Sequence, residues 1–238
     1  MRDPSLRTMT DDDVPGADGL RRLAGWNQTR EDWLRILALS PGGSFVAEEG
    51  GEIIGAVATV TYGREMAWIG MMLVHPSHRR KGLGSQLMRC AIEHLRSNSV
   101  DCIKLDATPL GRPVYERLGF LPEQTLTRWR RPPAPAAATA SEPQGMVRAL
   151  DEAVLPAVAA LDASAFGTAR LRLLQHLAGN AHRAFTVFRG GELEGFGMLR
   201  PGDQADHLGP MACSNATAAA ALLAPLLLAA QNRAVVWD

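Results

Sequence analysis

The segment best suited to chemistry is a basic turn punctuated by glycines, which reads Arg79-Arg80-Lys81-Gly82-Leu83-Gly84-Ser85. An apolar stretch precedes it and an amphipathic one follows, so the turn joins a predicted strand to the start of a predicted helix. A helix begins with unpaired N–H groups and the positive end of its dipole, which attract an anion. Glycine has no Cβ, so a phosphate can approach the backbone closely. The turn therefore predicts a pyrophosphate site, with a solvated basic turn as the alternative.

Two familiar phosphate motifs do not describe this turn. No GK[ST] sequence follows the glycines, as a P-loop would require. No third glycine stands at the spacing of a dinucleotide-binding loop either. We therefore expect backbone N–H groups and the neighbouring cations to hold the anion.

The flanking pattern predicts the elements that would position this turn. Residues 67–74 are apolar on both faces of a strand, which is typical of the centre of a sheet. In 82–97 apolar residues recur at every fourth position, which predicts an amphipathic helix. We also expect strands at 44–48, 52–61 and 102–106, a helix capped by Thr29, a short helix at 112–118 and an extended segment at 120–130.

This order of elements predicts an α/β (α+β) fold with a mixed, mostly antiparallel sheet and flanking helices. The strands at 67–74 and 102–106 should run parallel, because a helix connects them through a right-handed crossover.

A Pro/Ala-rich stretch divides the chain. Residues 131–145 read RPPAPAAATASEPQG, which predicts a linker between a first domain at 1–130 and a second at 146–238. The second domain repeats the element order of the first, and FVAEEGGEIIG at 45–55 aligns with FTVFRGGELEG at 185–195. We interpret the second domain as a shortened copy of the same fold.

Two motifs give the chain a family resemblance. Residues 79–84 fit the [RQ]xxGx[GA] acetyl-CoA motif of the GNAT superfamily of N-acetyltransferases, on the strand–turn–helix where that family carries it. Residues 106–120, DATPLGRPVYERLGF, resemble the family's downstream strand and helix, with a tyrosine followed by xxLGF. The resemblance covers roughly residues 5–130, and the tandem layout with a degenerate second GNAT-like half resembles a bacterial subgroup. It implies a GNAT fold and acetyl-CoA as cofactor.

The resemblance also implies how the cofactor would be held. The backbone N–H groups from Arg79 or Arg80 onward would bind the pyrophosphate, and the central strand would pair with the pantetheine arm in a cleft where it splays from the strand ending at Asp106. Thr108 is a further candidate contact. The expected cofactor-binding residues are Leu73, Val74, Arg79, Arg80, Lys81, Gly82, Leu83, Gly84 and Ser85.

Tyr115 is the catalytic residue that the resemblance implies. Its phenol would protonate the departing thiolate, and a tyrosine with an ordinary pKa of about 10 carries that proton at neutral pH. The alternative is a helix tyrosine that merely packs against the sheet. The N–H of Val74 would stabilise the oxyanion.

The general base and the acceptor contacts stay open. His75 is a candidate base because histidine titrates near neutral pH, and Glu65, the run Asp11–Asp13 or water are the alternatives. Trp26 and Asn27 are candidate contacts for the substrate, because their loop lies in the region that covers the acceptor site in GNAT folds. Core filling is the alternative for Trp26.

The second domain lacks the features that would bind a cofactor. In place of the basic turn it reads Cys213-Ser214-Asn215-Ala216-Thr217, without glycine or a cation, and it has no counterpart of Tyr115 before Asp238. We therefore expect one cofactor site per chain. The second domain would be structural, form a wall of the acceptor pocket, or make a homodimer.

Composition excludes several classes of function. The 25 basic and 25 acidic residues cancel, so the basic excess of a nucleic-acid-binding surface is missing. Three cysteines without a CxxC pair predict neither a disulfide framework nor a metal site, and favour the cytoplasm. The longest apolar run, 218–230, is shorter than the roughly 20 residues that a membrane span needs. Residues 1–8 lack the apolar core of a signal peptide.

The sequence thus predicts an acetyl-CoA-dependent N-acetyltransferase that acetylates a primary amine of a small molecule by direct attack. A non-catalytic acyl-CoA sensor is the alternative from another class. A protein N-terminus or lysine is the alternative acceptor.

Overall fold

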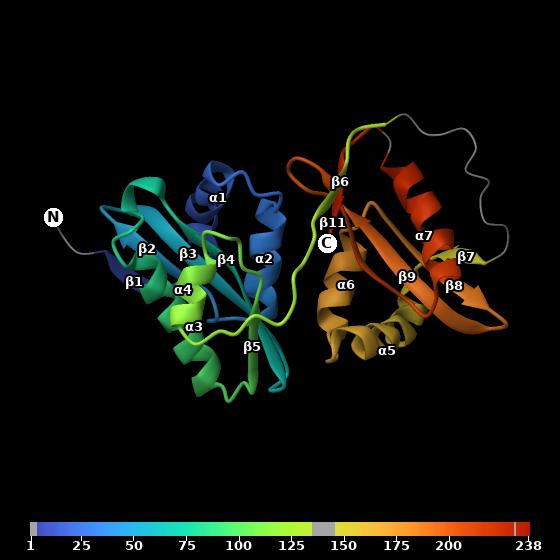
Figure 1. The fold of residues 1–238 in the computed structure, drawn as a ribbon, viewed down its shortest axis with the longest axis horizontal. Coiled ribbons are helices and arrows are strands. Elements are labelled where there is room, and N and C mark those ends of the chain that lie inside the picture. The colour runs from blue at the N-terminus through green and yellow to red at the C-terminus, as the bar shows by residue number, and fades with distance from the viewer. Residues whose placement is uncertain (1–3, 135–145, 231) are drawn as a thin grey trace. The chain divides into compact units, whose positions relative to one another are not determined.

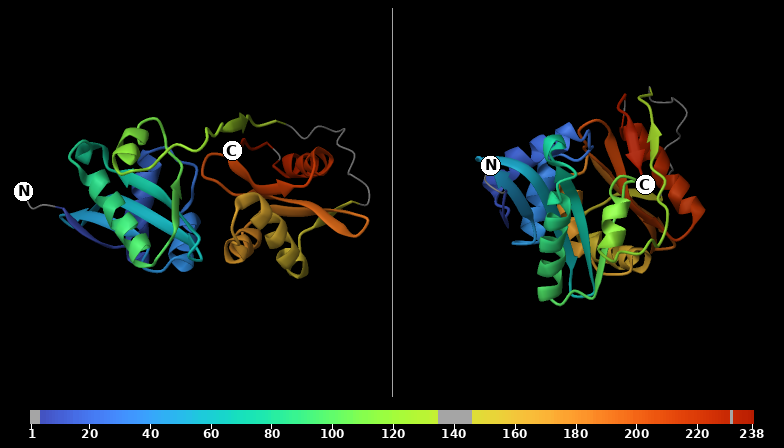
Figure 2. Two further views of the ribbon diagram at one scale, coloured as in Figure 1. Left: turned by 60° about the horizontal axis from the view of Figure 1, so that its bottom comes forward. Right: turned by 60° about the vertical axis from the view of Figure 1, so that its left-hand side comes forward.

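The computed structural model describes residues 4–134, 146–230 and 232–238. The chain forms two compact units, Met1–Thr125 and Leu126–Asp238, each with a sheet of its own (Figure 1). Figure 2 shows that helices cover both faces of each sheet.

The N-terminal unit has a five-stranded sheet in the order β1-β2-β3-β4-β5. Neighbouring strands are antiparallel, except that β4 and β5 are parallel because α3 connects them. This confirms the predicted mixed sheet. Its strands are β1 (Ser5–Thr8), β2 (Phe45–Glu49), β3 (Glu52–Tyr62), β4 (Met66–Val74) and β5 (Cys102–Leu105).

Two cores hold this sheet between its helices. On one face α3 (Leu83–Ser97) buries its apolar stripe, and α4 (Arg112–Arg117) lies on the same side. On the other face α1 (Val14–Leu23) and α2 (Arg30–Leu39) enclose Trp33, which is fully buried. The predicted cap of α2 is confirmed, since the N–H of Thr29 donates to Asp32 over 2.6 Å. Helix α1 had no counterpart among the predicted elements.

Strand β4 carries a bulge that turns its side chains over. Side chains two positions apart on a strand normally share a face. In β4, however, Ala67 and Ile69 contribute to the α3 core, whereas Met71 and Leu73 contribute to the core on the other face of the sheet. The pairing with β3 shifts between Gly70 and Leu73, and Met71 has φ +52°. A bulge inserts one extra residue, and a slip of one residue exchanges the two faces of a strand.

The C-terminal unit repeats this plan. Its sheet has the order β6-β11-β10-β9-β8-β7, and α7 (Ala216–Ala229) connects the parallel strands β10 and β11. Helices α5 (Leu155–Phe166) and α6 (Leu171–Gly179) cover the face opposite α7 (Figure 2). The strands are β6 (Trp129–Arg131), β7 (Val147–Ala149), β8 (Arg183–Arg189), β9 (Glu192–Arg200), β10 (Asp206–Cys213) and β11 (Val235–Trp237). The predicted second copy of the same fold is confirmed.

The boundary between the units differs from the predicted one. Residues 129–131, placed at the end of the first domain and the start of the linker, form β6 and pair with β11 of the second sheet. Arg128 also makes an ion pair of 2.6 Å with Asp238. Local sequence could not reveal this partner, which lies more than a hundred positions away. Most of the predicted linker, 135–145, lies outside the described residues.

Within the described part of the chain, no single helix has both the length and the apolar character needed to cross a bilayer. Residues Glu152–Phe166 and Leu171–Gly179 meet that threshold only when counted together, and a bend of 118° separates them.

Candidate active site: a cradle of backbone donors beside an open strand edge

The N-terminal sheet opens between β4 and β5. Their pairing runs from Met66 opposite Cys102 to Ile69 opposite Leu105, where β5 ends while β4 continues to Val74. The N–H of His75 donates to Ile54 of β3 over 2.8 Å. Backbone N–H groups alternate in direction along a strand, so the N–H of Val74 points to the open edge. This is the edge where the resemblance places the pantetheine arm.

The turn after β4 presents a row of unsatisfied donors. Arg79 N–H donates to Pro76 over 3.4 Å, and the first backbone bond of α3 runs from Gln86 to Gly82 over 3.1 Å. Between them, the N–H groups of residues 80–85 have no hydrogen-bond acceptor among the described residues. No side chain caps α3, whose N-cap is Gly82. These donors are free for an anion.

The two glycines of the turn serve different purposes. Gly82 has φ +85° with open space where a Cβ would stand, so it supplies the left-handed backbone and leaves room for a ligand. A Cβ on Gly84 would lie 3.1 Å from Cε of Met72, so Gly84 lets the first turn of α3 pack closely on β4. Arg80 shares the left-handed conformation, with φ +61°.

The three cationic side chains of the turn also have different roles. Arg79 donates from Nε to the carbonyl of Val74 over 3.0 Å, which fastens the turn to the end of β4. Arg80 and Lys81 are exposed and have no ion-pair partner among the described residues. Arg80 and Lys81 are therefore the side chains available to neutralise a phosphate.

Tyr115 lies on α4 with its ring in the α3 core. The ring packs edge-on against Phe120 at 6.3 Å, and a Cβ on Gly111 would lie 2.9 Å from the Tyr115 ring. Burial raises the pKa of Tyr115, so the phenol keeps its proton at neutral pH. Its hydroxyl has no hydrogen-bond partner among the described residues. The ring is thus fixed by packing while the proton remains available.

The candidate acceptor residues are more constrained than their sequence suggests. Trp26 packs its ring against the core under α1 and α2, and its carbonyl accepts from Arg21 over 2.8 Å. Asn27 follows in the same loop and is half-buried. Thr108 accepts from the N–H of Gly111 over 3.2 Å and so supports the loop before α4.

A cleft of about 600 Å³ lies beyond the end of β4, on the face of the sheet that α1 covers. His75 lines this cleft. The sequence did not reveal the cleft, because α1 was not predicted. The lining residues are Arg7, Asp12, Asp13, Gly16, Gly19, Leu20, Leu23, Glu48, Gly51, Glu52, Ile53 and His75.

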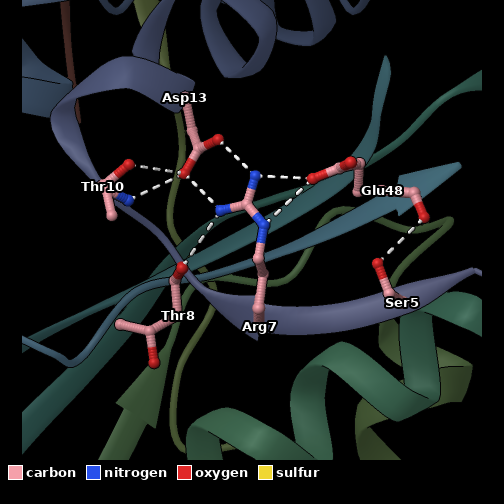
Figure 3. Close-up of polar contacts among 6 residues, drawn as sticks. All are labelled: Ser5, Arg7, Thr8, Thr10, Asp13 and Glu48. Atoms are coloured by element: carbon pink, nitrogen blue, oxygen red, sulfur yellow. Dashed lines mark hydrogen bonds and ion pairs between the residues drawn. The ribbon is translucent and has the colours of Figure 1, made fainter. Parts of the chain in front are cut away.

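One guanidinium organises the wall of this cleft. Figure 3 shows Arg7 between two carboxylates. Its Nη1 lies 2.7 Å from Asp13, and its Nη2 lies 2.7 Å from Glu48. The hydrogen bonds from Arg7 lower the pKa of the buried Asp13 to about 2. Of the acidic run proposed as an alternative base, Asp13 is thereby committed to an ion pair.

Two matches to family models decide the family. Residues 11–120 match a model of the acetyltransferase (GNAT) family, and residues 158–238 match a model of an acetyltransferase (GNAT) domain. Together these matches span more than half of the chain. The chain belongs to the GNAT acetyltransferase family.

The relatives of this GNAT chain agree with that assignment. The N-acetyltransferase YitH of Bacillus subtilis, itself uncharacterized, is 26% identical over 227 residues, covering 90% of this chain and 76% of YitH. Mycothiol acetyltransferase of Tsukamurella paurometabola is 32% identical over 142 residues, covering 56% of this chain and 41% of that protein. The structure of a candidate acetyltransferase from Pyrococcus horikoshii shares the fold, with a TM-score of 0.82 at 24% identity over 99% of this chain and 80% of the other.

The second GNAT half has a helix start of a different kind. Asn215 caps α7, and its side chain accepts from the N–H of Ala218 over 2.8 Å. The N–H of Ser214 donates to the carbonyl of Glu194 over 2.8 Å. The third N–H of α7 is thus satisfied by a side-chain cap, whereas no side chain caps α3.

Proposed function

We propose that this GNAT acetyltransferase binds acetyl-CoA at the turn 79–85 and transfers the acetyl group to a primary amine of a small molecule by direct attack. The observation that carries the proposal is the row of unpaired backbone donors at residues 80–85, beside the open edge of β4. The relative named mycothiol acetyltransferase supports a small-molecule acceptor.

The residues present fit the diphosphate of coenzyme A. Consecutive free N–H groups and the start of α3 supply donors, Gly82 leaves space, and Arg80 and Lys81 supply positive charge. Leu73 and Val74 would hold the pantetheine arm at the open edge of the strand. Acetyl-CoA, when bound, supplies an activated thioester.

The chain's own groups would then act on this thioester. The N–H of Val74 would donate to the oxygen that gains charge as the amine attacks. The hydroxyl of Tyr115 would give its proton to the departing sulfur. No covalent link to the protein is needed. The second GNAT half would serve as a structural unit, a wall of the acceptor pocket or a homodimer contact.

Calorimetry with acetyl-CoA tests the cofactor site. We expect one acetyl-CoA per chain, because the start of α7 is capped by Asn215 and carries neither a glycine nor a cation. The double variant Arg80→Ala/Lys81→Ala should bind at least about tenfold more weakly, since it removes two charge-assisted contacts. A stoichiometry near two acetyl-CoA per chain, or an affinity for acetyl-CoA that is unchanged in the double variant, would contradict the assigned site.

A thiol-release assay over a range of amines tests the reaction. Release of coenzyme A that depends on a small primary amine supports the transfer. Tight binding of acetyl-CoA without release for any amine would point to a sensor instead, and release with peptides alone would point to a protein acceptor.

A further inference from the structure

A continuous row of hydrogen-bonding side chains lies at the end of β4. Nδ1 of His75 is 2.7 Å from Oγ of Ser77, and the same Oγ is 2.9 Å from Nδ1 of His78. Nε2 of His78 is in turn 2.9 Å from a carboxylate oxygen of Glu49, on β2. These four residues are called the relay below.

The carboxylate at one end sets the direction of the hydrogen bonds in the relay when His78 carries a single proton. An ionised carboxylate only accepts, so Nε2 of His78 donates to Glu49. A neutral His78 then accepts at Nδ1 from the Ser77 hydroxyl, whose oxygen accepts from Nδ1–H of His75. The other nitrogen of His75, Nε2, is left without a proton. In this tautomer Nδ1 of His75 gives up the long hydrogen bond of 3.4 Å that it can accept from the Ser77 N–H, in exchange for the shorter one of 2.7 Å to Ser77 Oγ.

His75 belongs to the wall of the cleft beyond β4. Apolar side chains contribute to its lining, among them Leu23, which is 62% exposed. The lining also includes four carboxylates: Glu48 and Asp13 are paired with Arg7, whereas exposed Asp12 and Glu52 have no ion-pair partner among the described residues. Free carboxylates together with apolar side chains suit an ammonium group on an apolar body.

We propose that this cleft binds the acceptor amine and that Nε2 of His75 is the general base that deprotonates it. This inference rests on the proposed function and names its substrate class, a cationic primary amine with an apolar body. His75, which lines the cleft, follows Val74 directly in the chain, and Val74 lies at the open edge of β4 where the thioester arm would lie.

The proton movement along the relay is balanced. An N–H bond of the ammonium breaks and its proton moves to Nε2 of His75, which leaves the nitrogen a lone pair for attack. The proton on Nδ1 of His75 passes to Oγ of Ser77, while the Ser77 hydroxyl proton passes to Nδ1 of His78. His78 becomes an imidazolium beside the Glu49 carboxylate. His75 ends neutral, and Ser77, His78 and Glu49 are positioning residues.

Nitrogen NMR of the histidines in the full-length protein tests the relay without any acceptor. We expect His75 to be protonated at Nδ1 and His78 at Nε2 at neutral pH, with assignments from His75→Gln and His78→Gln. In Glu49→Gln the preference of His78 should weaken, because an amide can also donate. A His75 protonated at Nε2 in the wild-type protein overturns the proposal.

Kinetics with 2-phenylethylamine test the catalytic role. We expect His75→Gln to lower kcat at least about 100-fold, the usual loss on removing a general base, with calorimetric affinity for acetyl-CoA unchanged. Ser77→Ala should also lower kcat, and Ser77→Thr should restore much of the rate because it returns the hydroxyl. His176→Gln, on α6 and outside the site, is the matched control.

The pH profile separates a base from a merely structural residue. The fall in kcat toward acid pH should disappear in His75→Gln and persist in Asp12→Asn, which removes a charge from the cleft and should raise KM for the amine. The other titratable groups lining the cleft are Arg7, Asp13, Glu48 and Glu52. An unchanged profile in His75→Gln overturns the proposal.

Different results contradict the acetyl transfer and the role of the cleft. Protein that does not bind acetyl-CoA contradicts the proposed function. Turnover that is insensitive to His75→Gln and Ser77→Ala, or faster with glucosamine than with 2-phenylethylamine, contradicts the inference about the cleft while leaving acetyl transfer intact.

Discussion

At the scale of the residue, the site depends on groups that the fold leaves without partners. The donors of residues 80–85 and the hydroxyl of Tyr115 have none among the described residues, although unpaired polar groups are costly when buried. The cost is low where solvent can reach them, and these groups gain a partner when a ligand binds. The sequence motifs predicted the backbone donors of the turn and the position of the tyrosine, because glycines, cations and a tyrosine are visible in the sequence.

Tyr115→Phe removes only the hydroxyl and keeps the ring that packs on Phe120. We expect kcat to fall about 100-fold for loss of the general acid, with affinity for acetyl-CoA nearly unchanged. Thiol release and calorimetry measure the two effects. Tyr62→Phe, at the other tyrosine of the chain, is the control. Full activity in Tyr115→Phe would show that the tyrosine is only a packing residue.

Gly82→Ala tests the backbone of the cradle. With φ +85°, an alanine here should lower the free energy of unfolding by about 1–2 kcal/mol and distort the donors around it. Weaker binding of acetyl-CoA should accompany the loss. Gly179→Ala is the matched comparison, since that glycine has open space and no positive φ. Equal stability and affinity in the two variants would contradict the assigned role of Gly82.

At the scale of the element, strand β4 and the segments that meet it create the working surfaces. The bulge at Met71 exchanges the faces of the strand, and β5 ends early enough to leave an open edge. Arg7 links β1, the turn 11–13 and β2 into one wall of the cleft through Asp13 and Glu48. None of these features has a local sequence pattern, because each depends on which segment lies opposite.

The Arg7–Asp13 pair predicts a dependence of stability on pH. The folded-state pKa of Asp13 is about 2, below its ordinary value of about 3.9, so the stabilisation is complete above pH 4 and is lost as pH falls toward 2. Asp13→Asn should therefore cost about 1–2 kcal/mol at pH 7 and progressively less below pH 4. Urea unfolding at pH 3, 4 and 7 measures this. Asp12→Asn, at an exposed neighbour, should show no such difference.

At the scale of the whole molecule, the two halves share one packing solution. A Cβ on Gly55 of β3 would lie 2.8 Å from Leu87 of α3, and a Cβ on Gly195 of β9 would lie 3.2 Å from Leu222 of α7. These glycines end the two aligned GGE segments, and both leucines are fully buried. The repeat seen in the sequence therefore reflects a helix leucine seated over a strand glycine in each unit.

This shared packing predicts a compensating pair of changes. Gly55→Ala and Gly195→Ala should each lower the free energy of unfolding by about 1–3 kcal/mol through overpacking. Adding Leu87→Ala or Leu222→Ala to the matching glycine variant should cost less than the sum of the single changes, because the space is shared. Thermal unfolding of the single and double variants measures the coupling. Strict additivity would show that these contacts do not define the packing.

The sequence by itself determined the local order of elements, the glycine turn and the repeat. Periodicity, capping residues and glycine positions act over a few neighbours, so they are legible without a structure. Only the tertiary structure decided that 129–131 pair with β11, that α1 closes a cleft over His75, and that Glu49 lies against His78. Each of these contacts joins residues far apart in the chain, and the partner of such a contact is chosen by packing and hydrogen bonding across the fold.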